Sequence, residues 1–226
     1  MLELIRDPKQ WTWRPNSLLR RIVLCFVGVM IVSLGTAICL HGKTGVDPFT
    51  ALQQSVTEVT GLSLAVLSPI INLVMLILII PFDRKIFGLG TLMNALLFGV
   101  FVTVFLDVLE GFYTFEYSLG GMLVHLVIGL TLYCLGLSIY ISTDIGQGAA
   151  DGLAPVLTRK FKNVSYRTFR IGQDVISALI ALIILRFDLS LSSVGVGTLI
   201  MSLFIGVIVD FFNRTVSNWL ISYLRL

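Results

Sequence analysis

The chain has 226 residues, of which 56% are hydrophobic and only 13% are charged, and its mean hydropathy is +0.95. Soluble domains carry about 25% charged residues, so this composition argues against a water-soluble globular fold. The formal net charge of +3 does not indicate nucleic-acid binding, because the meaning of each charge depends on its position relative to the membrane.

The first predicted element is a membrane-spanning helix over Ile22–Leu40. It resembles the start of a signal peptide, but its 19 residues exceed the roughly 7–15 apolar residues of a cleaved segment. We therefore expect a retained helix, preceded by residues 1–21 as a cytoplasmic or interfacial N-terminus. Trp11 and Trp13 are expected in the headgroup layer, where indole rings are favoured.

A short amphipathic helix is predicted after the first span, introduced by a turn that contains Gly45. Asp47 is a favoured N-cap residue, Pro48 suits the first helical position, and Gly61 predicts the end of the helix. Gly45 and Asp47 are candidate ligand-binding residues because the N-terminal end of such a helix presents free N–H groups.

Two further spans, over Leu62–Phe82 and Ile86–Leu109, complete the first half of the chain. Asn72 has ten residues of its span on either side. Polar groups at that depth usually face a cavity or a partner rather than lipid. Asn72 is therefore a candidate site residue.

A fourth span over Gly120–Thr143 carries His125 near its outer end. The histidine either binds a substrate or forms a local hydrogen bond, and both interpretations stay open. A second glycine-rich turn and a second short helix follow this span, with Gly146, Gln147 and Asp151 as candidate site residues.

The two short helices allow two placements. In the first, each turn dips toward the membrane centre, so that the positive end of a half-helix meets a ligand. In the second, each helix lies flat on a membrane surface. Glycine permits both turns, so the sequence leaves the choice open.

The fifth and sixth spans are predicted over Tyr166–Phe187 and Val194–Phe212. Only 11 residues separate Asp174 from the next charged residue, which is roughly 17 Å of helix, so the span must extend back past Asp174. Asp174 then lies near the midplane as a candidate proton or cation site, and we expect it to line a central cavity with Arg170, Gln173 and Asn72. The alternative is an Arg170–Asp174 pair that neutralises itself one turn apart.

The two halves of the chain contain a repeat. Residues 88–105 align without gaps with residues 195–212 at nine identical positions of 18, including three glycines and a threonine. The matched small residues are expected to let helices pack closely. Leu34-Gly35 aligns with Leu135-Gly136, and another glycine follows ten residues after each.

Each half contains three crossings, an odd number, so the second half must enter from the opposite face. We therefore expect an all-α polytopic membrane protein of six transmembrane helices. It would form two inverted three-helix repeats, each with a short amphipathic or re-entrant helix after its first span. The predicted segments are repeat 1 over 22–109, repeat 2 over 120–212 and a cytoplasmic tail over 213–226.

The positive charges fit this arrangement. With the N-terminus inside and six spans, 14 of the 16 Lys and Arg residues lie on the cytoplasmic side, where positive residues near spans are retained. Lys43 and Arg186 are the two left outside. Both termini are therefore expected in the cytoplasm.

Several motifs resemble the bacterial YczE/YyaS/YitT-like family of small integral membrane proteins, and the resemblance covers nearly everything from Ile22 to Phe212. The motifs are Gly45-Val46-Asp47-Pro48-Phe49, the turn from Gly146 to Gly152, and the segments Gly90-Thr91-Leu92 and Gly197-Thr198-Leu199. The resemblance implies a bacterial cytoplasmic (inner) membrane protein of the shorter YczE type, without the soluble C-terminal domain of YitT-type members. It implies no particular substrate and no catalytic residue.

The sequence shows no nucleophile and base pair, metal-ligand cluster or phosphate loop, so we expect no enzyme activity, cofactor or metal. The three cysteines lie in apolar runs and suggest no disulfide. The expected function is transport of a small molecule or ion through a site at the repeat interface near the midplane. The alternative is a non-transporting partner or modulator of another membrane complex. The expected partners are the lipid bilayer and the substrate, and a homodimer stays open.

Overall fold

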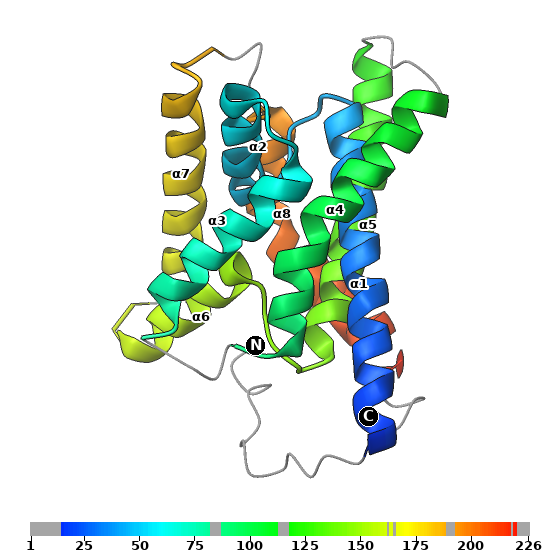
Figure 1. The fold of residues 1–226 in the computed structure, drawn as a ribbon, viewed down its shortest axis with the longest axis vertical. Helices are drawn as coiled ribbons and strands as arrows, with labels where there is room; N and C mark the ends of the chain where they lie inside the picture. Colours follow the sequence, from blue (N-terminus) through cyan, green and yellow to red (C-terminus); the bar gives the residue numbers. More distant parts are fainter. Residues whose placement is uncertain are drawn as a thin grey trace.

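The computed structural model describes residues 15–81, 87–112, 118–161, 163–164, 166–188, 193–217 and 219–220. These residues form eight α-helices and a π-helical turn, with no strand among them (Figure 1). The predicted headgroup position of Trp11 and Trp13 lies outside the described residues. The helices are α1 (Pro15–His41), α2 (Pro48–Thr60), α3 (Leu64–Ile79), α4 (Leu89–Phe112), α5 (Leu119–Ser142), α6 (Ala149–Lys160), α7 (Tyr166–Ile184) and α8 (Val196–Phe212), and the π-helix is η4 (Asn213–Ser217).

Four of the described helices are long and apolar enough to cross a membrane. They lie at the first, third, fourth and sixth predicted spans, over Leu18–His41, Leu89–Phe112, Leu119–Ser142 and Val196–Ser217. The second and fifth predicted spans coincide with α3, which is apolar but has 16 residues, and with α7, which has 19 residues and carries charge. An all-helical fold is therefore confirmed for the described residues, with four helices that meet the length and hydropathy expected of a span.

The helices α3 and α7 turn apolar side chains outward and polar side chains inward. On α7, Val175 and Ile176 are exposed whereas Gln173 and Asp174 are buried. On α3, Asn72 is buried at 2% exposure. This pattern is the reverse of a water-soluble helix, and it fits lipid on the outside and a polar interior.

The centre of the molecule is a close contact between α1 and α5. A Cβ atom built on Gly35 would lie 2.5 Å from Tyr133 N, and one built on Gly136 would lie 2.5 Å from Val32 N. No side chain fits in these gaps, so the two backbones touch directly, as small residues allow in membrane helices. The prediction that matched glycines let helices pack closely is confirmed at Gly99, whose Cβ position would lie against Leu64 O of α3.

The other six described helices pack around this central pair, and several of their contacts are equivalent in the two halves. Helix α4 packs on α1 and α8 packs on α5, while α2 packs on α7 and α6 packs on α3. Each short helix therefore contacts a helix from the other half of the chain. Figure 1 shows α2 in the upper part of the molecule and α6 in the lower part.

The two turns that introduce the short helices have positive φ angles at equivalent positions. Lys43 and Gly45 have φ angles of 49° and 93°, and the residues 101 positions later, Asp144 and Gly146, have φ angles of 55° and 121°. Both turns thus place a non-glycine residue and then a glycine in the left-handed region, so the sequence repeat extends to local structure.

Each turn is held by the start of α4 or α8. Gly90 N donates to Ile145 O at 2.8 Å, and Gly197 N donates to Thr44 O at 2.9 Å. The donors are matched residues in the gapless alignment, and the acceptors are 101 positions apart. Each half therefore fixes the turn of the other half with an equivalent backbone hydrogen bond.

The last predicted span ends later than expected. The helical path continues past Phe212 as the π-helix η4, whose first residue Asn213 accepts a hydrogen bond from Ser138 Oγ at 2.7 Å. The start of the predicted 213–226 tail is therefore packed on α5, because its polar side chains bond to that helix.

Gly61 ends α2 as predicted, and its φ angle of 69° lies in the left-handed region. Gly61→Ala is expected to lower the free energy of unfolding by about 1 kcal/mol, because alanine is strained at this angle although the space around it is open. Thermal unfolding in detergent measures the effect. Gly206→Ala in α8 is the control: its site is equally open and helical, so no loss is expected. Equal losses in the two variants would contradict the prediction.

Candidate functional site

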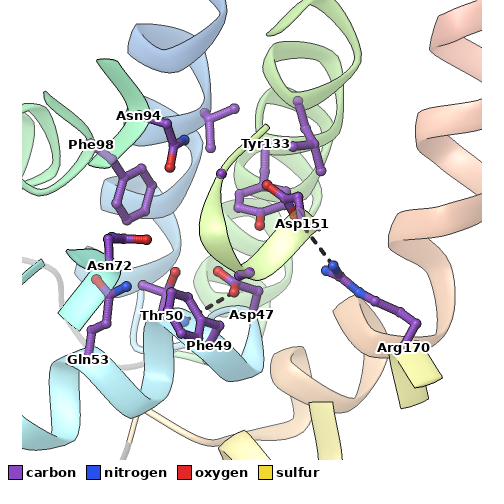
Figure 2. Close-up of a pocket in the computed structure, with 14 residues that line it drawn as sticks. Asp47, Phe49, Thr50, Gln53, Asn72, Asn94, Phe98, Tyr133, Asp151 and Arg170 are labelled. Atoms are coloured by element: carbon purple, nitrogen blue, oxygen red, sulfur yellow. Dashed lines mark hydrogen bonds and ion pairs between the residues drawn. The ribbon is translucent and has the colours of Figure 1, made fainter. Parts of the chain in front are cut away.

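A cavity of about 30 Å³ lies among α1 to α7 (Figure 2). A cavity needs roughly 10–15 Å³ to hold one water molecule, so this one holds on the order of two water-sized groups. Its lining residues are Val32, Asp47, Phe49, Thr50, Gln53, Asn72, Asn94, Phe98, Tyr133, Leu137, Gly148, Ala150, Asp151 and Arg170.

The N-terminal ends of both short helices border this cavity. Asp47 is the N-cap of α2, with Oδ1 accepting a hydrogen bond from Thr50 N at 3.1 Å, and Gly148 is the N-cap of α6. Asp151 lies in the first turn of α6. Each positive helix end thus meets a carboxylate of its own helix, which the helix dipole stabilises.

Arg170 of α7 joins two carboxylates at the cavity wall. Its Nη1 lies 3.4 Å from Asp151 Oδ1, and its Nε lies 3.6 Å from Asp174 Oδ1. The Asp47 charge acts on both of these aspartates. Three carboxylates therefore surround one guanidinium in the described part of the site, which gives it a formal net charge of −2.

Two buried acceptor atoms of the cavity residues have no hydrogen-bond partner within the described ranges. They are Asp47 Oδ2 and Gln53 Oε1. Buried polar atoms in native proteins nearly always have a partner, and leaving one unpaired costs about 1–3 kcal/mol. These oxygens are therefore available to accept a hydrogen bond or to contact a cation.

The structure brings together four of the predicted site residues and places two others behind the wall. Asp47, Asn72, Asp151 and Arg170 line the cavity. The expectation that Gln173 and Asp174 also line it is corrected. Gln173 Nε2 donates to Ala150 O at 2.9 Å, and the Asp174 carboxylate pairs with Arg170. The Arg170–Asp174 pair considered as an alternative is thus present, one turn apart on α7.

The other predicted residues lie away from the cavity. Gly45 and Gly146 contact the starts of α8 and α4, respectively. Gln147 is half-buried but is not a lining residue. His125 Nε2 lies 3.5 Å from His41 Nδ1, and His125 Nδ1 lies 2.8 Å from Gly121 O.

Sequence reasoning missed several lining residues, of which Thr50, Gln53, Asn94 and Tyr133 carry polar side chains. One signal was available: Asp47, Thr50 and Gln53 are spaced by three and therefore share one face of α2. Tyr133 lies in an apolar run, so its sequence context predicts a buried core residue and not a cavity residue. Asn94 aligns with Met201 in the repeat, so the comparison of halves hides it.

The described residues include no group of three His, Cys, Asp or Glu side chains that could hold a metal ion. The three cysteines are buried and free, so no disulfide joins them. The polar chemistry of the cavity is that of carboxylate, amide, phenol, hydroxyl and guanidinium groups.

Comparison with known proteins gives three relatives of uncharacterised function. The chain is 28% identical over 146 residues to the uncharacterized membrane protein YczE of Bacillus subtilis (strain 168), covering 64% of this chain and 66% of YczE. It is 26% identical over 196 residues to the uncharacterized protein YyaS of the same organism, and the match covers 87% of this chain and 94% of YyaS. It is 23% identical over 222 residues to an uncharacterized protein of Haemophilus influenzae, covering 96% of each. The expected resemblance to YczE and YyaS is confirmed.

No solved structure matches the chain. The family described as "Family of unknown function (DUF6198)" matches residues 19–214, which is most of the chain. With a membrane protein among its relatives and four helices long and apolar enough to span, the chain is a membrane protein of uncharacterised function. It belongs to the family of unknown function DUF6198.

Proposed function

We propose that the protein is a transporter of the cytoplasmic (inner) membrane that moves a small molecule or ion through the cavity between its two halves. The observation that carries this proposal is the meeting of both half-helix ends at one polar cavity, where Asp47 caps α2 and Gly148 caps α6. Secondary transporters place their binding sites at such paired, interrupted helices.

We further propose that six helices cross the membrane as two inverted repeats. Helices α3 and α7 would be about 24 Å and 28 Å long, and their outward faces are apolar. Together with the four long apolar helices, they make three crossings in each half. The paired packing of α2 on α7 and α6 on α3, from opposite ends of the molecule in Figure 1, supports an inverted relationship.

Both termini are proposed to lie in the cytoplasm. The distribution of positive charge favours this topology, and one long-range contact supports it. Arg21 Nη1 at the start of α1 donates to Thr143 O at the end of α5, at 2.6 Å. With the N-terminus inside, the start of the first crossing and the end of the fourth lie on the cytoplasmic side, as this contact requires.

The cavity favours transport over the alternative of a non-transporting partner. A modulator that binds another complex through its surface has no need for a buried polar cavity lined from both halves. A charged residue inside a membrane protein is costly and usually serves a ligand or ion pathway. We also favour transport over enzyme activity, because the sequence shows no nucleophile and base pair.

The proposal predicts solute uptake by proteoliposomes that contain the purified chain. The probes are radiolabelled sodium, methylammonium, urea and formate, which sample cations, neutral solutes and anions of small size. At least one should enter faster than into protein-free liposomes. Asp47→Asn should reduce that uptake about tenfold or more, because one missing ionic contact costs roughly 1.5–3 kcal/mol.

Asp210→Asn is the matched control, since Asp210 belongs to an ion pair at the end of α8 whose side chains are 39% and 75% exposed. Its uptake should equal that of the wild type. Uptake of no probe, or equal uptake by the Asp47→Asn variant, contradicts the proposed role of the cavity.

A further inference from the structure

Two cavity residues have a buried oxygen without a hydrogen-bond partner among the described residues. Asp47 and Gln53 both line the cavity and are 4% and 1% exposed, and the unpartnered oxygens are Asp47 Oδ2 and Gln53 Oε1. The amide nitrogen of Asn72 donates to Ser68 O at 2.9 Å and to Ser68 Oγ at 3.1 Å. Because both of its N–H groups are used, the Asn72 carbonyl oxygen is left for the cavity.

The charges in the site select the sign of the ligand. Arg170 forms ion pairs with Asp151 and Asp174, and its charge also acts on Asp47, so one guanidinium is shared by three carboxylates. An anion at Asp47 would meet a negative charge and unpaired oxygens. A cation would be attracted by the negative charge and could be contacted by the unpaired oxygens.

The size of the cavity restricts the ligand further. About 30 Å³ accommodates on the order of two water molecules, which is too little for an amino acid or a nucleotide in this conformation. The described residues include no group of three acidic, His or Cys side chains that could hold a metal ion, so a divalent ion would lack the charged ligands it prefers. A single positive charge is sufficient to compensate Asp47.

We propose that the cavity binds a small monovalent cation through Asp47 Oδ2 and Gln53 Oε1, with the Asn72 carbonyl oxygen beside them. Carboxylate and amide oxygens are ligands of hard metal ions, and the same oxygens accept hydrogen bonds from ammonium. Sodium, potassium and ammonium ions share this chemistry. That the bound cation is also transported rests on the proposed function. Binding of the cation does not, and it can be tested without measuring transport.

The test is thermal unfolding of the purified chain in detergent. Choline chloride is the reference salt, and NaCl, KCl or NH4Cl replaces it at constant ionic strength. One of the three cations should raise the midpoint saturably, by on the order of 5 °C at about 100 times its Kd. Asp47→Asn should abolish this shift and still fold, because asparagine is an equally good N-cap. Gln53→Leu should weaken the apparent affinity about tenfold by removing one ligand oxygen.

Gln54→Leu is the matched control. Gln54 is the next residue on α2, bonds to Glu58 at 3.1 Å and does not line the cavity, so its cation affinity should be that of the wild type. A shift that persists in Asp47→Asn places the cation elsewhere and overturns the inference. The absence of a shift with all three cations overturns it as well. The inference is also overturned if lowering the pH raises the unfolding midpoint but none of the three cations does, because Asp47 then binds a proton instead.

The uptake experiment separates this inference from the proposed function. Cation binding that requires Asp47, together with no uptake of any probe by proteoliposomes, supports the binding site and overturns transport. Uptake of urea or formate without any cation-dependent shift supports transport and overturns the cation site.

Discussion

Gly35→Ala is expected to separate the two central helices and to lower the free energy of unfolding by about 3 kcal/mol. The new Cβ atom would lie 2.5 Å from Tyr133 N and 2.6 Å from Gly129 O. Both are backbone atoms of α5, so no side-chain rotation relieves the contact, and α1 must move. Overpacking of a well-packed interior costs about 1–3 kcal/mol, and a backbone obstacle places this variant at the upper end.

The measurement is the yield of monodisperse protein in size-exclusion chromatography together with the unfolding midpoint in detergent, which should fall by roughly 5–10 °C. Gly136→Ala should behave alike, because its Cβ atom would lie 2.5 Å from Val32 N. Gly172→Ala in α7 is the control, since no atom lies within 4 Å of its Cβ position. If Gly35→Ala is as stable as Gly172→Ala, the close contact of α1 and α5 is absent from the folded protein.

The sequence predicts the short helices well because local chemistry determines their ends. Asp47 and Gly61 act as the N-cap and the C-terminal stop of α2, as expected from their residue types. The matched glycines at the starts of α4 and α8 allow close approach, but of the two glycine-containing turns and not of a helix as expected. Gly206 does not: its aligned partner Gly99 touches Leu64 O, whereas Gly206 faces open space. Alignment of halves identifies equivalent positions but not which neighbour each one meets.

The lining of the cavity was harder to predict because side-chain direction depends on packing. Spacing places Arg170 and Asp174 on one face of a helix, but it does not show that only Arg170 reaches the cavity. Depth within a span identifies Asn72 without indicating that Gln53 of α2 is nearby. Residues of seven helices line this cavity, and no short sequence pattern predicts which side chains of different helices come together.

Arg170→Gln is expected to destabilise the protein strongly. Arg170 is 18% exposed in its side chain, and its two carboxylate partners are 17% and 8% exposed. Removing one member of a buried ion pair leaves the other charge uncompensated and costs about 3–5 kcal/mol. Here two carboxylates, Asp151 and Asp174, lose their cation. The unfolding midpoint in detergent should therefore fall, and the chain should become more sensitive to added denaturant.

The exposed pair Arg214–Asp210 is a matched control with the same i, i+4 spacing as Arg170–Asp174. Its nitrogen and oxygen lie 2.8 Å apart, closer than those of the buried pair, but Arg214 is 75% exposed. Water and salt screen such pairs, so Arg214→Gln should change the free energy of unfolding by no more than about 1 kcal/mol. If the two variants lose equal stability, Arg170 lies in a solvated environment and its ion pairs do not stabilise the fold.

A double variant distinguishes the ion pair from mere loss of a side chain. Combining Arg170→Gln with Asp151→Asn removes one unpaired carboxylate and leaves two amides that can hydrogen-bond to each other. About half of the lost stability should return, since the Asp151 charge is removed whereas Asp174 still lacks its cation. Asp47 keeps its charge and its cap in this variant, so the double variant should still show the cation-dependent shift. Recovery of stability without that shift would mean that Arg170 orients Asp47 rather than only anchoring α7 to α6.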